Sequence, residues 1–233
     1  MDQYKGSDVD KYRCFMSGEG EKNTIWMEGA PPNYDAVNKL FEEGKTKIWP
    51  PGSLGEQVQN LVKTWEMELV HKPNGKDMKS TDAEKLFESI FINGRKAEGG
   101  AYNMFLQTSL PEKVRVYDPT KESSESAHKI FVDTFPKGFA MEVLEVYSGP
   151  PVIAYKFRHW GYMEGSFKGH LPTKEIAEMI GVSIFKLNEE FKIVSAEFFY
   201  DRGELLAGLI KNGSTTIPGD TNTDLSSSKC PFS

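Results

Sequence analysis

Hydrophobic and polar residues follow two different periods along the chain. In several segments before residue 138 apolar residues recur every three or four positions, as in helices, and from Phe139 onward they recur every second position, as in strands. The clearest helical pattern predicts a helix over 53–71, opened by Ser53 and Glu56 in the S-x-x-E spacing of a capping box. Its apolar stripe consists of Leu54, Val58, Leu61, Val62, Trp65 and Leu69.

Two further helices are predicted on the same grounds. Residues 35–48 have apolar side chains at helical spacing and end at the Pro-Pro sequence of 49–52, and residues 124–135 end at Pro136. Residues 87–92 fit either a short strand or the end of a helix. A short amphipathic segment at 204–210 closes the patterned region.

The period of two predicts four strands in the second half of the chain. They are expected at 140–147, 152–160, 175–187 and 193–200. Helices followed by successive strands indicate an α+β fold, in which helices cover one face of an antiparallel sheet. We expect an N-terminal arm and helix at 1–52, an α+β body at 53–212 and a flexible tail at 213–233; the tryptophan at position 26 suggests that part of the arm packs back on the body.

Composition narrows the classes of function. The 233 residues carry a net charge of −6 without a basic tract, which argues against nucleic-acid binding. No stretch is apolar enough for a membrane span and the N-terminus lacks a signal sequence, so we expect a cytoplasmic protein. Cys14 and Cys230 allow one bridge but no disulfide framework, and we expect no metal and no cofactor.

Long sequence strings point to a known family. In order, they are GEGEKNTIW, GAPPNYDAVNKLFEEGKTKIWP, VKTWEMELVHK, YNMFLQTSLP, VYSGPPVIAYKFRHWGYMEGSFKGH and EFFYDRGELLAG. In these strings, which span most of the chain, it resembles the plant pathogen-related protein family, whose members are linked with plant defence. The resemblance implies the cone-shaped fold of SnoaL-like polyketide cyclases and nuclear transport factor two, in which a curved sheet wraps around helices and leaves an apolar cavity.

A more distant resemblance covers the last third of the chain. The SnoaL-like pattern G-T-H-x-G-x-F-x-G-x-x-P-T falls on residues 161–173 and matches the glycines, the Phe and the Pro-Thr. The histidine of that pattern falls on Met163, which cannot transfer a proton. The cyclases' acid/base aspartate, followed by a Leu-Leu helix, falls on Asp201 with Leu205 and Leu206.

Two candidate catalytic residues follow, each with a structural alternative. Asp201 would gain a raised pKa in an aromatic pocket, which suits proton abstraction, but it also stands where it would cap the closing helix. His159 shares a strand face with apolar residues, so it is either a satisfied core histidine or a replacement for the base missing at Met163. His71 would be stabilised as a cation at a helix C-terminus.

The expected ligand pocket is lined by Tyr155, Phe157, Met163, Phe185 and Phe199. Three hypotheses of function stay open. The first is binding of an apolar terpenoid or polyketide-like molecule in plant defence or specialised metabolism, with cofactor-free cyclase or isomerase activity. The second is a non-catalytic facilitator that holds an intermediate or docks on a biosynthetic enzyme such as a membrane-bound haem monooxygenase. The third is a structural homodimer formed through the open sheet face.

Overall fold

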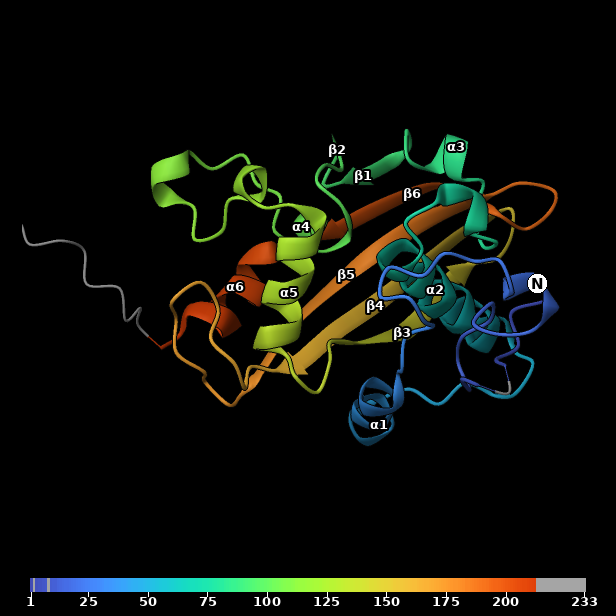
Figure 1. The fold of residues 1–233 in the computed structure, drawn as a ribbon, viewed down its shortest axis with the longest axis horizontal. Helices are drawn as coiled ribbons and strands as arrows, with labels where there is room; N and C mark the ends of the chain where they lie inside the picture. The colour runs from blue at the N-terminus through green and yellow to red at the C-terminus, as the bar shows by residue number, and fades with distance from the viewer. Residues whose placement is uncertain (2, 8, 213–233) are drawn as a thin grey trace, which may run out of the picture.

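One six-stranded sheet organises the protein (Figure 1). The computed structural model describes residues 1–212 except 2 and 8, so the tail expected at 213–233 lies outside the described residues. The order across the sheet is β2-β1-β6-β5-β4-β3. The strands are β1 (Ile90–Ile92), β2 (Arg95–Lys96), β3 (Ala140–Ser148), β4 (Val152–Tyr162), β5 (Ile176–Leu187) and β6 (Ile193–Tyr200).

The four predicted strands are confirmed as β3 to β6, which form an antiparallel meander. The sheet extends beyond this meander, because β1 pairs in parallel with β6 and adds a short hairpin with β2. The segment 87–92 therefore includes a strand, which follows the short helix α3 (Ala83–Leu86). Three-residue strands give too little periodicity to be recognised from sequence alone.

The predicted helices are present, with one shorter than expected. Helix α1 ends at Gly44 rather than at residue 48. At the start of α2 the Ser53 hydroxyl accepts the Glu56 backbone N–H at 3.3 Å, while the Glu56 carboxylate accepts the N–H of Gly52 instead of that of Ser53. The longer helices are α1 (Asp35–Gly44), α2 (Leu54–His71), α4 (Ala101–Phe105), α5 (Ser124–Thr134) and α6 (Arg202–Ile210).

The two faces of the sheet carry different layers. In Figure 1, α2, α4 and α5 lie in front of the sheet, and their apolar side chains share one core with the inner face of the sheet, where Phe157 and His159 of β4 point. Arg158 and Trp160 point to the outer face, where Trp160 packs with Phe41 of α1 and the Arg158 guanidinium lies 4.5 Å from the Trp160 ring. Because side chains alternate along a strand, β4 packs against the inner-layer helices with one set of side chains and against α1 with the other.

The N-terminal arm packs against the body, as the sequence predicts. Trp26 is 8% exposed, and the hydroxyl of the buried Tyr4 donates to the backbone carbonyl of Phe191 at 2.9 Å. The buried Lys72 ammonium contacts Glu21 of the arm at 3.0 Å and Glu68 of α2 at 2.9 Å. These contacts fix the arm beside the inner face, where it becomes part of the site.

Candidate functional site

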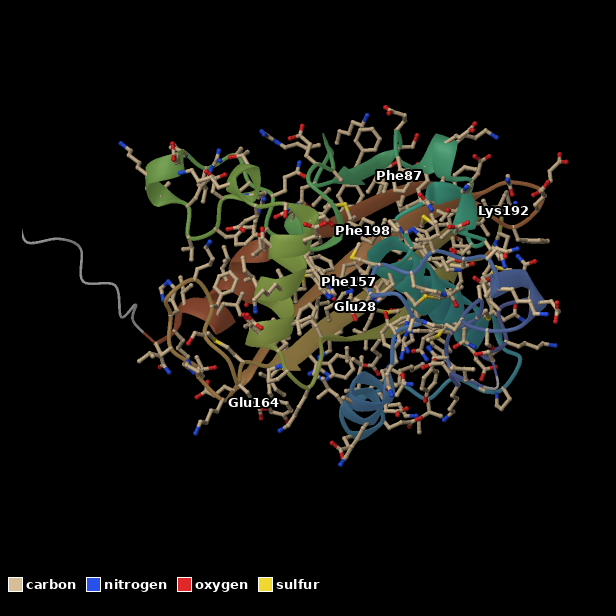
Figure 2. The ribbon with its side chains drawn as sticks, in the orientation of Figure 1. Glu28, Phe87, Phe157, Glu164, Lys192 and Phe198 are labelled. Carbon is tan, nitrogen blue, oxygen red and sulfur yellow. The ribbon has the colours of Figure 1, made fainter. Side chains whose placement is uncertain are left out.

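A cavity of about 340 Å³ lies between the inner sheet face and the helices. Phe157 and Phe198, both labelled in Figure 2, line it from β4 and β6, and Glu28 lines it from the arm. Helices α2, α4 and α5 supply the opposite walls. A cavity of this size with mainly apolar walls, many of them aromatic, is suited to an apolar small molecule.

Gly181 of β5 makes room for this arrangement. A side-chain carbon at this position would lie 2.7 Å from the Phe157 ring and 2.7 Å from the carbonyl oxygen of Phe199. Because no such carbon is present, the tip of the Phe157 ring can lie close to the backbone of β5. The aromatic wall of the cavity therefore depends on a glycine in the neighbouring strand.

An acid/base pair lies in the wall of the cavity. The His159 Nε2 atom is 3.0 Å from the Glu66 carboxylate, which comes from the middle of α2. The His159 side chain is 7% exposed and that of Glu66 is 27% exposed, so the carboxylate keeps access to the cavity. An ionised carboxylate only accepts hydrogen bonds, so a proton on Nε2 would make this contact a favourable one.

Aromatic rings surround this histidine. Phe139 stacks on it with 5.3 Å between ring centroids, and Phe105 and Phe157 contact it from other sides. Its second ring nitrogen, Nδ1, is buried without a hydrogen-bond partner. Such surroundings exclude water and hold the imidazole in one orientation, with Nε2 directed at Glu66.

A second polar group of residues stands at the arm side of the cavity. The rings of His71 and His128 lie 5.8 Å apart, at the end of α2 and within α5. The Arg13 guanidinium lies 3.6 Å from the centre of the Tyr34 ring. Burial, together with the charges of His128 and Arg13, lowers the pKa of His71 to about 4. His71 is therefore neutral near pH 7, which corrects the expectation of a stabilised cation at this helix end.

The structure separates the two residues predicted to be catalytic. His159 lines the cavity, whereas Asp201 is exposed, lies outside the set of lining residues, and accepts the Gly203 N–H at 2.7 Å as the N-cap of α6. The capping interpretation of Asp201 is thus observed. Its catalytic role stays a prediction, because a cap does not exclude a second role.

Only some of the predicted ligand residues line the cavity. Phe157 lines the cavity, while Tyr155, Met163 and Phe185 are fully buried in the adjoining core and do not line it. Phe199 is 42% exposed on the outer face, which corrects its predicted place in the pocket. Side chains alternate along β6, so Phe198 faces inward where Phe199 was expected.

Sequence reasoning missed Glu66, although a signal was present. Glu66 follows Val62 by four positions and precedes Leu69 by three, so it lies within the apolar stripe of α2. A charged residue inside such a stripe faces the core or a cavity. The signal for His128 was weaker, because Ala127 and Phe131 already accounted for the buried face of its helix.

The described part of the chain contains neither a membrane-spanning helix nor a cluster of metal ligands. None of its helices is long and apolar enough to cross a bilayer. Among residues 1–212, leaving out 2 and 8, no group of three or more His, Cys, Asp or Glu side chains has the arrangement of a metal site.

Comparison with known proteins places the chain in a family. No protein-family model matches it. A pathogen-related protein from Hordeum vulgare is 52% identical over 232 residues, covering 95% of this chain and 94% of the relative. The chain belongs to the pathogen-related protein family.

Solved structures resemble the protein only loosely. A protein with a ketosteroid isomerase-like fold from Catenulispora acidiphila has 9% identity and a TM-score of 0.36, with 68% of this chain and 97% of that chain covered. A SnoaL-like polyketide cyclase from Agrobacterium tumefaciens has 14% identity and a TM-score of 0.32, covering 64% and 88%. With TM-scores this low, the assignment of the chain to its family rests on the sequence relative alone.

Proposed function

We propose that the protein binds an apolar small molecule in the cavity and transfers a proton on it through His159 and Glu66. The observation that carries the proposal is the 3.0 Å contact between the His159 imidazole and the Glu66 carboxylate within an aromatic wall. Imidazole and carboxylate are the groups most often used for general acid/base catalysis. Cyclisation or isomerisation of a terpenoid or polyketide-like substrate, in plant defence or specialised metabolism, can proceed through such a step without a cofactor.

The geometry favours a different role for each of the two residues. The Glu66 carboxylate, being partly exposed, is the group that a substrate C–H can reach, and it would act as the base. His159, fixed by its ring contacts, would donate a hydrogen bond from Nε2–H to the oxygen of a developing enolate, and the proton held by Glu66 would then return to a carbon of the substrate, which restores the carboxylate. Exclusion of water by the rings strengthens both interactions.

Hydrogen–deuterium exchange of a ketone tests this proposal without knowledge of the natural substrate. We expect the protein to accelerate exchange at the acidic carbon of 2-tetralone, an apolar bicyclic ketone, as followed by proton NMR. His159→Gln and Glu66→Gln should each lower the rate by about a hundredfold or more. Asp201→Asn, which keeps an oxygen acceptor at the helix cap, should leave the rate unchanged.

The same set of variants separates the two predicted catalytic residues. Loss of exchange in Asp201→Asn, with activity retained in His159→Gln and Glu66→Gln, would overturn the proposal in favour of Asp201. Absence of acceleration, although tetralone binding is detected by calorimetry, would reduce the site to a binding pocket.

A non-catalytic facilitator is the second candidate, and one observation favours it. The outer sheet face exposes large apolar side chains from two neighbouring strands, with Ile180 49% exposed and Phe199 42% exposed. An exposed apolar face is typical of an interaction site, for a biosynthetic enzyme in the cytoplasm or at a membrane surface, or for a second copy of the chain.

Ile180→Asp should abolish association, measured by co-purification and by solution mass, while tetralone binding persists. Association unaffected by Ile180→Asp would exclude this face.

A further inference from the structure

The arm side of the cavity gathers nitrogen donors that lack acceptors. No hydrogen bond of the His71 ring is found among the described residues, and Nδ1 of His128 is buried without a partner. The Arg13 side chain is 4% exposed; its Nη1 contacts Asp10 and Asn38, but its Nε is buried and unpaired. Buried donors in proteins are normally paired, so this group is incomplete as it stands.

The carboxylate beside the two imidazoles is weakly held, whereas Arg13 is already paired with the buried Asp10 carboxylate at 3.3 Å. Glu28 comes from the turn of the arm, and its carboxylate lies 3.7 Å from His128 Nε2, beyond hydrogen-bonding distance. Its side chain is 67% exposed, so water solvates it. Glu28 thus marks a position where a carboxylate is attracted, but it does not satisfy the donors behind it.

The rest of the cavity fixes how a ligand would lie. Glu66 and His71 both belong to α2 and are five residues apart, which corresponds to about 7.5 Å along the helix axis. Tyr34 packs against His71 and Tyr102 against His128, with ring centroids 5.9 Å and 5.5 Å apart. Both phenols are held neutral, and burial raises the pKa of Tyr102 to about 12. Repulsion by the Glu66 carboxylate keeps a negative charge away from the His159 end.

We propose that His71 and His128, with Arg13 behind them, bind a carboxylate group of the ligand. This subsite rests on the proposed function and deepens it, because it names the ligand class: an apolar, ring-containing molecule with one carboxylate at its end. The carboxylate lies against the two imidazoles on their cavity side, and the uncharged body extends along Phe157 and Phe139 toward the His159–Glu66 pair. One end is then fixed by charge and the other is presented to the acid/base pair.

Protonation of His71 should be coupled to binding. In the free protein, burial and the neighbouring His128 and Arg13 charges oppose a proton on His71. A carboxylate placed against the ring would reverse the local potential and favour the imidazolium. Binding of an acid should therefore raise the pKa of His71, whereas binding of a neutral molecule of the same shape should not.

A matched pair of ligands tests the subsite. 2-Naphthoate and 2-naphthamide share ring and shape and differ in charge, and calorimetry near neutral pH should show naphthoate binding about tenfold more tightly. His128→Gln and His71→Gln should remove this preference and leave the affinity for naphthamide unchanged. Glu28→Gln should strengthen naphthoate binding, because it removes a competing carboxylate.

In the unmodified protein, NMR titration of His71 should show its pKa rising with saturating naphthoate and unmoved with naphthamide.

The outcomes separate the subsite from the wider proposal. Equal affinities for the two compounds, or a His71 pKa unmoved by naphthoate, would overturn the carboxylate subsite while an apolar pocket that binds 2-tetralone remains. Failure of 2-tetralone and both naphthyl compounds to bind would overturn the subsite and the proposed function together. Because the NMR titration uses the unmodified protein, a poorly folding variant cannot decide the result.

Discussion

Lys63 of α2 lies inside the protein against aromatic rings. The residue is 1% exposed, and its ammonium nitrogen is 3.0 Å from the centre of the Phe41 ring and 4.2 Å from that of Tyr12. No ion pair within the described part of the chain includes Lys63. Burial lowers its pKa well below the ordinary value, and the Arg13 charge lowers it further. The rings offset only part of the cost of removing this charge from water.

Lys63→Met should therefore stabilise the protein at neutral pH. The folded state binds the Lys63 proton less readily than the unfolded state, so the wild-type free energy of unfolding should gain from Lys63 as pH rises toward the ordinary lysine pKa. Chemical denaturation between about pH 7 and about pH 10 should show Lys63→Met more stable at the lower pH, with the difference shrinking as pH rises. A constant difference across this range would contradict the buried, destabilised charge.

At the scale of elements, α2 is the helix that contributes both to the hydrophobic core and to the candidate site. Its apolar stripe supplies the core through residues such as Trp65, which packs between Phe185 and Phe198 of the sheet. The same helix presents Glu66 to the cavity and ends at His71. Any change in where α2 begins or how firmly it is held should affect both polar groups of the site.

Ser53→Ala should destabilise the protein by about 1 kcal/mol, because it removes the acceptor of the Glu56 N–H. For a chain of this length, this corresponds to a melting temperature lower by about 2–4 °C. Ser53→Asp is the matched control, since it restores an acceptor and places a negative charge at the helix N-terminus. Equal melting temperatures for Ser53→Ala and the wild type would show that the cap contributes little.

The sequence predicted those elements whose signals are long and local. The stripe of α2 and the alternation from β3 to β6 extend over many residues, so both appear in the structure with small shifts at their ends. The pairing of Ile90 with Ala196 could not be predicted, because it joins a three-residue strand to a partner more than a hundred positions away. The His159–Glu66 contact was hidden for the same reason, since it arises only when α2 is placed on β4.

At the scale of the whole molecule, the arm forms part of the functional site. It supplies Arg13, Glu28 and Tyr34 to the cavity wall, and its Met27 N–H donates to the His71 carbonyl at 2.9 Å. Trp26 fixes this stretch by packing with buried methionines of the arm and of α2. The arm and the α+β body thus enclose the cavity together.

Trp26→Ala should loosen the arm and destabilise the protein by about 3 kcal/mol. Hydrogen exchange measured by mass spectrometry should accelerate in the peptide covering residues 24–34, and naphthoate binding should weaken. Ile25→Ala is the matched control, because Ile25 is 57% exposed and its removal should change stability by less than about 0.5 kcal/mol. Unchanged exchange in Trp26→Ala would show that other contacts hold the arm.

The parallel pairing of β1 with β6 has a consequence for the order in which the protein is made. The ribosome releases the arm, α2 and β1 long before β6, yet β1 pairs with β6, and Tyr4 bonds to Phe191 beside the last hairpin. The first half of the nascent chain therefore exposes apolar surface with no sheet to cover it, so folding must wait until the C-terminal strands emerge. During that interval the uncovered apolar surface makes the nascent chain prone to aggregation, and truncated products ending before β6 should be cleared by proteolysis rather than accumulate.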